Sequence, residues 1–237
     1  MAPDPSTPAA DSTDDGPGIS IDLPTDDGTN KPDSSVKVIL LITVLAIAPS
    51  LLVLMTGFTR IVVVLSLTRN ALGLQAIPPN QVLVGLALFL TAFVMFPTLA
   101  RVNEEAIKPL EAGEITQEQA YERAVDPIKK FMLDQTRKSE LAMFVDESGR
   151  KPATPADIGL TTLVPAFVLS ELKTAFIIGF VIFVPFLIID LIVSSALMSM
   201  GMFMLPPILV SLPFKLLLFV MVDGWNLIVR SLLDSFR

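Results

Sequence analysis

An uncharged run of 24 residues lies between Asp190 and Lys215, with methionine at alternate positions through its middle. Gly201 and the pair Pro206-Pro207 interrupt any straight helix through this run. Backbone that is not helical does not face lipid, because its N–H and C=O groups would lack partners there. We therefore expect the middle of the run to be buried in protein or to line a water-filled cavity.

The whole chain is apolar apart from one acidic segment. Of its 237 residues, 52% are hydrophobic and 17% are charged, and the mean hydropathy is +0.66. Soluble domains have about a quarter of their residues charged, so this composition predicts a membrane protein. The net charge of -7 comes from residues 1–36, and the remainder holds 16 acids and 16 bases. Nothing in this charge distribution predicts a nucleic-acid partner.

The chain contains no cysteine and no histidine. A disulfide framework and a thiolate metal site are therefore excluded, and the usual metal ligand and general base are missing as well. Carboxylate and Ser-Lys chemistry remain open in principle, but neither has a recognisable local motif. We expect no enzyme activity, no cofactor and no metal site.

Residues 1–36 are rich in Pro, Asp, Ser, Thr and Gly and hold few large apolar side chains. A segment of this composition buries too little surface to offset the entropy lost on ordering. The sequence therefore predicts a disordered acidic tail over residues 1–36.

Two apolar segments predict an N-terminal hydrophobic helical hairpin over residues 37–100. The first, residues 38–59, has 22 uncharged residues, which suffice to cross a hydrocarbon core of about 30 Å. The second covers about residues 81–97. Arg60 and Arg69 lie at or near the expected connecting turn, so the positive-inside bias predicts that this turn is cytoplasmic.

Residues 101–157 carry charges of both signs and predict a small inserted helical domain. Thr116 is a suitable N-cap for an amphipathic helix, and the apolar residues after it recur near helical spacing. Asp126-Pro127 predicts a break or the start of a second helix. If the turn at Arg60 to Arg69 is cytoplasmic, this domain is extracytoplasmic.

Residues 158–237 predict C-terminal hydrophobic helical hairpins interrupted by charges and prolines. A charge near the centre of a bilayer is costly, so the charged residues here need partners, water or a place outside lipid. Glu171 and Lys173 are two positions apart and point in different directions on a helix, so we do not expect them to pair. We expect Asp190 and Lys215 to face each other at the base of a hairpin; alternatively, they only end helices at the membrane interface.

The tip of this hairpin is predicted at residues 202–205. On one helix the methionines would divide between two nearly opposite faces, whereas in an extended loop alternate side chains point to one side. The spacing of two therefore predicts a loop that presents its methionines together, as a constriction requires. Ordinary packing of methionine in a membrane helix is the alternative. A transporter would also hold intramembrane carboxylates, but no inverted pair of interrupted segments is evident.

Short blocks across roughly residues 38–237 occur in a characteristic order. They are Phe58-Thr59-Arg60-Ile61, Arg69-Asn70-Ala71-Leu72-Gly73, Pro78-Pro79-Asn80-Gln81, Gln135-Thr136-Arg137, Ser170-Glu171-Leu172-Lys173, Pro185-Phe186-Leu187-Ile188-Ile189-Asp190, Leu212-Pro213-Phe214-Lys215 and Asp223-Gly224-Trp225. Together the blocks resemble the FliP and SctR family of type III secretion export-gate subunits, and the flagellar branch more than the virulence branch.

The resemblance implies a core subunit of the flagellar protein export gate in the bacterial inner membrane, at the flagellar basal body. Such subunits are multi-pass by hydropathy and assemble as five copies into a helical, ring-like channel. Their partners are FliQ-like and FliR-like subunits and the FlhA-like and FlhB-like export components, and unfolded flagellar proteins pass through the centre. Their hairpins lie largely above the membrane plane, so subunit contacts would surround the charges. The competing interpretation is a stand-alone membrane transporter or ion channel.

The resemblance also assigns candidate site residues. The family's methionine-rich loop maps onto Met202, Phe203 and Met204, and Phe203 departs from the usual run of three methionines. The expected constriction residues are Met198, Met200, Met202, Phe203 and Met204. The expected charge contacts for assembly are Arg60, Glu171, Lys173, Asp190, Lys215 and Asp223.

Overall fold

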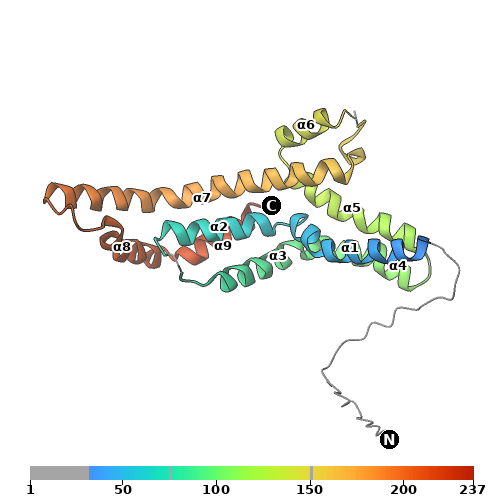
Figure 1. Ribbon diagram of the computed structural model, residues 1–237, viewed down its shortest axis with the longest axis horizontal. Helices are drawn as coiled ribbons and strands as arrows, with labels where there is room; N and C mark the ends of the chain where they lie inside the picture. Colours follow the sequence, from blue (N-terminus) through green and yellow to red (C-terminus); the bar gives the residue numbers. More distant parts are fainter. Residues whose placement is uncertain (1–31, 75, 150–151) are drawn as a thin grey trace, which may run out of the picture. The chain divides into compact units, whose positions relative to one another are not determined.

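A computed structural model describes residues 32–74, 76–149 and 152–237 of the chain, and this part is helical throughout, without a strand (Figure 1). The described residues fall into two compact units that divide between Thr43 and Val44. The helices are α1 (Pro32–Leu54), α2 (Phe58–Ala71), α3 (Asn80–Val102), η1 (Asn103–Ile107), α4 (Lys108–Glu111), α5 (Gln117–Gln135), α6 (Lys138–Glu147), η2 (Pro155–Asp157), α7 (Leu160–Ser199), α8 (Pro207–Met221) and α9 (Gly224–Asp234). Helices α2 to α9 all belong to the second unit. The predicted all-helical class is confirmed for the described residues.

Helix α7 is the longest element, with 40 residues. At 1.5 Å per residue it is about 60 Å long, roughly twice the thickness of a hydrocarbon core. It runs unbroken through Pro185 and Asp190, where the sequence predicted an interruption. A proline removes only one backbone donor, and the apolar turns on both sides keep the helix continuous here.

Helix α2 packs along α7, and the two lie side by side in Figure 1. Its residues Ile61, Val64 and Leu65 are fully buried, and their spacing of three and four places them on one face of the helix. Gly179 of α7 allows the close approach, because a Cβ there would lie 2.3 Å from Leu67 Cδ1.

The predicted hairpin with its turn at Arg60 to Arg69 is wrong. Helix α1 ends at Leu54, and α2 then carries both arginines and ends at Ala71, so the next turn comes after both arginines and before α3 begins at Asn80. No charge or proline marks the break at residues 55–57, so the uncharged run resembles one continuous helix. Arg60 is 2% exposed, so it gives no support to a cytoplasmic turn.

The segment 101–157 is continuous with its neighbours. Helix α3 passes through η1 into α4 without the break expected at residue 100. Met132 of α5 packs with Leu163 and Phe167 of α7 in a buried cluster, so the segment shares a core with the C-terminal region. An extracytoplasmic location for it stays a prediction.

Helix α5 begins as predicted, with a complete capping box between Thr116 and Gln119. The break expected at Asp126-Pro127 is wrong, because α5 continues through Pro127 to Gln135. Pro127 lacks the N–H that would donate one helical hydrogen bond, and its ring is buried among neighbouring side chains.

Of the tail predicted for residues 1–36, the part up to residue 31 lies outside the described residues, whereas residues 32–36 belong to α1.

Two helical stretches among the described residues are long and apolar enough to cross a membrane, Asn80–Glu111 and Leu160–Ser199. A third exists if α8 and α9, which meet at a bend of 64°, are counted as one span. These stretches agree with a membrane-associated protein.

Candidate functional site

The methionine segment begins at the end of α7, where a glycine cap terminates the helix. The N–H of Gly201 donates to the carbonyl oxygen of Met198 at 3.1 Å, and the N–H of Met202 donates to that of Leu197 at 3.0 Å. This pair of bonds is the Schellman motif, which requires a residue with a left-handed backbone directly after the helix. Gly201 supplies it with φ of +75°.

This cap divides the five candidate constriction residues. Met198 lies in the last turn of α7 and Met200 is its C-cap, whereas Met202, Phe203 and Met204 lie in the loop before α8. The extended loop expected through all four methionines is therefore wrong, because Met198 lies within α7 and Met200 is its C-cap. The predicted hairpin is confirmed: α7 and α8 form its arms and contact each other.

The loop tip is exposed despite its apolar character. Met202, Phe203 and Met204 are 41%, 78% and 97% exposed, respectively. Contiguous exposed apolar side chains of this kind mark a surface that another molecule or a membrane covers.

A partly buried ion pair anchors the base of the hairpin. Lys215 Nζ of α8 lies 2.5 Å from Asp190 Oδ2 of α7 and also donates to the carbonyl oxygen of Ala71 at 3.1 Å. Ser211 Oγ donates to Asp190 Oδ1 at 2.6 Å. The predicted pairing of Asp190 with Lys215 is confirmed, and through Ala71 it also ties the hairpin to the end of α2.

A second buried cluster surrounds the guanidinium of Arg60. Its Nε donates to Glu171 Oε2 at 3.0 Å, and its Nη2 donates to Glu171 Oε1. The remaining donors reach Gln135 Oε1 at 3.0 Å, the carbonyl oxygen of Ser235 at 2.6 Å and Ser235 Oγ at 3.0 Å. A fork of donors shared among a carboxylate, an amide and a carbonyl suits arginine and no other side chain. Arg60 thus connects α2, α5, α7 and the residues after α9.

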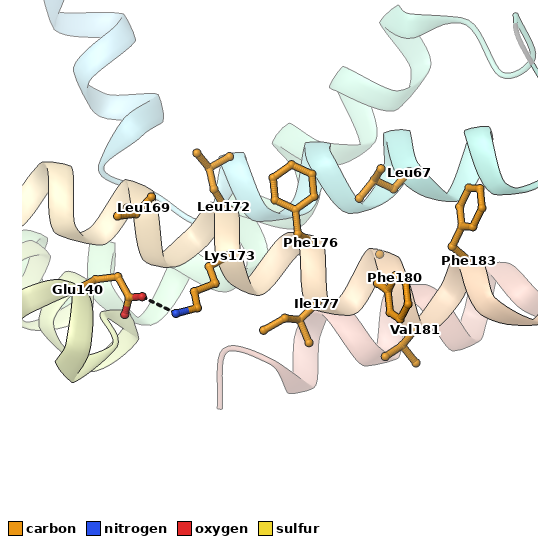
Figure 2. A pocket seen from close by; sticks show the side chains of 11 residues that line it. Leu67, Glu140, Leu169, Leu172, Lys173, Phe176, Ile177, Phe180, Val181 and Phe183 are labelled. Carbon is orange, nitrogen blue, oxygen red and sulfur yellow. Dashed lines mark hydrogen bonds and ion pairs between the residues drawn. The ribbon is translucent and has the colours of Figure 1, made fainter.

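Lys173 is paired with Glu140 rather than with Glu171, as Figure 2 shows. Lys173 Nζ donates to Glu140 Oε1 at 2.7 Å, and Ser139 Oγ donates to Glu140 Oε2 at 2.5 Å. These hydrogen bonds, that from Lys173 first, lower the pKa of Glu140 from its ordinary 4.5 to about 2. The expectation that Glu171 and Lys173 do not satisfy each other is confirmed.

The Lys173–Glu140 pair lies at one end of an open groove of about 940 Å³ beside α7. The walls are mainly apolar, and the rings of Phe176, Phe180 and Phe183 line it along α7 (Figure 2). The sequence did not predict this groove, because its residues come from three separate segments.

Asp223, the last of the predicted charge contacts, is exposed at the junction of α8 and α9. It has a left-handed backbone with φ of 49° and accepts a hydrogen bond from Asn226 Nδ2 at 3.0 Å. All six predicted charged residues therefore have a partner within the chain, and a role in assembly stays a prediction for each.

Several partners of these charges were missed. Gln135, Glu140, Ser211, Ser235 and Phe236 had no role in the sequence interpretation, although Gln135 stands in a block shared with the family. Ser235 and Phe236 carry no motif, so no sequence signal identifies them. Among the described residues, no group of three or more acidic, histidine or cysteine side chains is arranged to hold a metal ion.

Comparison with known proteins identifies the family. The FliP family model matches residues 41–232. The flagellar biosynthetic protein FliP of Bacillus subtilis is 60% identical over 204 residues, which cover 86% of this chain and 92% of that protein. The FliP proteins of Pectobacterium carotovorum and Caulobacter vibrioides are 52% and 51% identical, over 93% and 92% of this chain and 85% and 82% of theirs. The resemblance in the sequence is confirmed: the chain belongs to the FliP family of flagellar biosynthetic proteins.

Proposed function

We propose that the chain is a core subunit of the flagellar type III protein export gate. With FliQ-like and FliR-like partners it forms the channel through which unfolded flagellar proteins are exported, in five copies as the resemblance implies. FlhA-like and FlhB-like components work beside it at the flagellar basal body in the inner membrane. As a member of a family of flagellar biosynthetic proteins, the chain is a structural component of protein export and not an enzyme.

One observation carries the proposal: an exposed apolar loop stands at the tip of a hairpin whose base is held by an ion pair. The tip residues Met202, Phe203 and Met204 are exposed, while Lys215 and Asp190 fix the two arms to each other. Such a loop is poorly suited to a single subunit in water. Several copies around an axis would cover one another and leave a narrow apolar ring.

An apolar ring of this kind resists the passage of water and ions without a permanent plug. Methionine side chains are flexible and adapt to varied partners, so an arriving unfolded chain displaces them and the ring closes around it. Phe203 fills the same space with a stiffer side chain. Because Met198 and Met200 belong to the end of α7, they lie further back and would line the approach to the ring.

The length and surface of α7 support a location partly outside lipid. At about 60 Å, the helix exceeds a hydrocarbon core by about 30 Å. Large apolar side chains such as Phe180 and Ile192 are exposed along it. Packing against other subunits would cover these side chains above the membrane plane as well as within it.

The charged residues of α7 are more consistent with a structural subunit than with an ion transporter. Glu171 and Asp190, the two acidic residues of α7, are both paired with cations of the same chain. We propose that these pairs set the shape of each subunit before assembly. Lys173 and Asp223, which are more exposed, contact neighbouring subunits.

The proposal is tested by expressing the chain with and without its FliQ-like and FliR-like partners and sizing the detergent-extracted species. A multi-subunit particle that contains all three proteins is the expected result. A stable solitary species that moves a small solute would overturn the proposal in favour of a stand-alone transporter or channel.

A further inference from the structure

Ser235 and Phe236, directly after α9, converge on the buried guanidinium of Arg60. Arg60 Nη1 donates to the carbonyl oxygen of Ser235 at 2.6 Å and to its Oγ at 3.0 Å. Gln135 Nε2 donates to the carbonyl oxygen of Phe236 at 3.1 Å. These bonds use backbone and side-chain groups of two adjacent residues, so the segment is held in one specific position.

The ring of Phe236 completes this attachment. It lies 3.9 Å from Arg60 Cζ, within range of a cation–π contact, and stacks on Phe131 of α5 at 6.4 Å between centroids. The ring also covers Gly57, where a Cβ would lie 2.6 Å from its carbon atoms. A glycine directly before α2 therefore makes room for a side chain that is 179 positions further along the chain.

The same C-terminal region is attached to the other end of α2. Lys215 of α8 donates to the carbonyl oxygen of Ala71, the last residue of α2, while Arg60 lies in the first turn of that helix. Between the two attachments the chain bends by 64° at the junction of α8 and α9. Asp223 at this junction has a positive φ of 49°, which is uncommon for a residue other than glycine. Within the bend, Ile228 and Leu232 of α9 are buried in the core, so the two attachments add to contacts that α9 already makes.

We propose that Ser235 and Phe236 act as a latch that fastens α9 to the start of α2. The latch and the Lys215–Ala71 contact together hold the bent α8–α9 segment along α2, and so fix the arm that carries the methionine loop. Arg60 is a positioning residue in this device, and its two hydrogen bonds to Glu171 fix its orientation. The inference concerns the fold of the subunit and is independent of the proposed export function.

The latch is tested by hydrogen exchange with mass spectrometry on the full chain within its detergent-extracted assembly. Phe236→Ala removes the ring, whereas the matched control Arg237→Ala removes an exposed side chain that pairs only with the exposed Asp234. Loss of a local attachment raises the exchange of the helix it holds. The expected result is an increase on the order of tenfold in α9 and the first turn of α2, with α3 and the middle of α7 unchanged.

If the Phe236→Ala protein does not accumulate in cells, two milder variants test the latch in its place. Phe236→Leu retains apolar volume but loses the stacking and cation–π contacts. Gln135→Ala removes the bond to the carbonyl oxygen of Phe236 and one acceptor of Arg60. Both should raise exchange at α9 in the same pattern and to a smaller extent. Exchange at α9 equal to that of Arg237→Ala would overturn the latch, and so would a uniform increase over all helices, which indicates general destabilisation.

Discussion

Arg60 and Glu171, which are 111 positions apart, form a buried two-bond ion pair between the first turn of α2 and α7. Their side chains are 2% and 0% exposed. Bringing two charges into an apolar interior costs more than an exposed pair does, so the contribution of such a pair lies in fixing one arrangement of the two helices. The pair joins the start of α2 to α7, while Ala71 at the other end of α2 accepts a hydrogen bond from Lys215.

Breaking the pair from one side should be severe. Arg60→Ala leaves the Glu171 carboxylate buried without its cation, and we expect a loss of about 3–5 kcal/mol in the free energy of unfolding. The unfolding of the full chain in detergent can be monitored through Trp225, the single tryptophan. Arg101→Ala, at an exposed arginine near the end of α3, is the control and should change little. Wild-type stability of Arg60→Ala would contradict the role given to the pair.

Exchanging the charges of Asp190 and Lys215, at the base of the methionine hairpin, should show that the effect of one substitution depends on the other. Lys215→Glu places two carboxylates together and should strongly reduce the yield of the assembled complex. Adding Asp190→Lys should restore part of it, because the ion pair returns. Restoration stays incomplete because Ala71 loses its donor and Ser211 its acceptor. A double variant no better than Lys215→Glu would count against the pair.

The Lys173–Glu140 pair predicts a dependence of stability on acid. The pKa of Glu140 is about 2 in the folded chain against an ordinary 4.5, so folding favours the ionised carboxylate. Its contribution is complete above about pH 4.5 and is lost as the pH falls to about 2. Glu140→Gln should flatten this part of the profile of unfolding midpoint against pH, whereas Glu147→Gln on the same helix should leave it unchanged. An identical profile for both variants would contradict the assignment.

The methionine loop should act as the seal of the assembled channel. Met202→Ala combined with Met204→Ala shortens the tip side chains without touching the pair at the base of the hairpin. The complex should still assemble and should conduct small ions in planar bilayers, whereas the parent complex should not. Equal conductance in parent and variant would remove the sealing role.

The sequence predicted best where short-range chemistry determines the structure. Gly201 and Pro206 end one helix and begin the next for local reasons, and the expected hairpin placed Asp190 and Lys215 together at its base. The capping residue Thr116 is a further local signal that the structure confirms.

Contacts that depend on packing between distant segments were not predictable. Arg60 stands beside an uncharged run, which suggests an exposed turn, and only its partners 75, 111 and 175 positions away make its burial possible. Asp126-Pro127 predicts a break because proline lowers helix propensity, but the packing of the buried Pro127 ring outweighs one missing donor.

The most direct test of the export-gate proposal is to locate an export substrate in transit. A photo-cross-linking amino acid at position 204, where Met204 is 97% exposed, is compared with the same probe at Tyr121, which is exposed on α5. A flagellar substrate fused to a folded domain that arrests its export serves as the target. Cross-links to the arrested substrate from position 204 and none from position 121 are the predicted result. Absence of cross-links from position 204 in assembled, export-competent complexes would contradict the passage of substrates past the methionine loop.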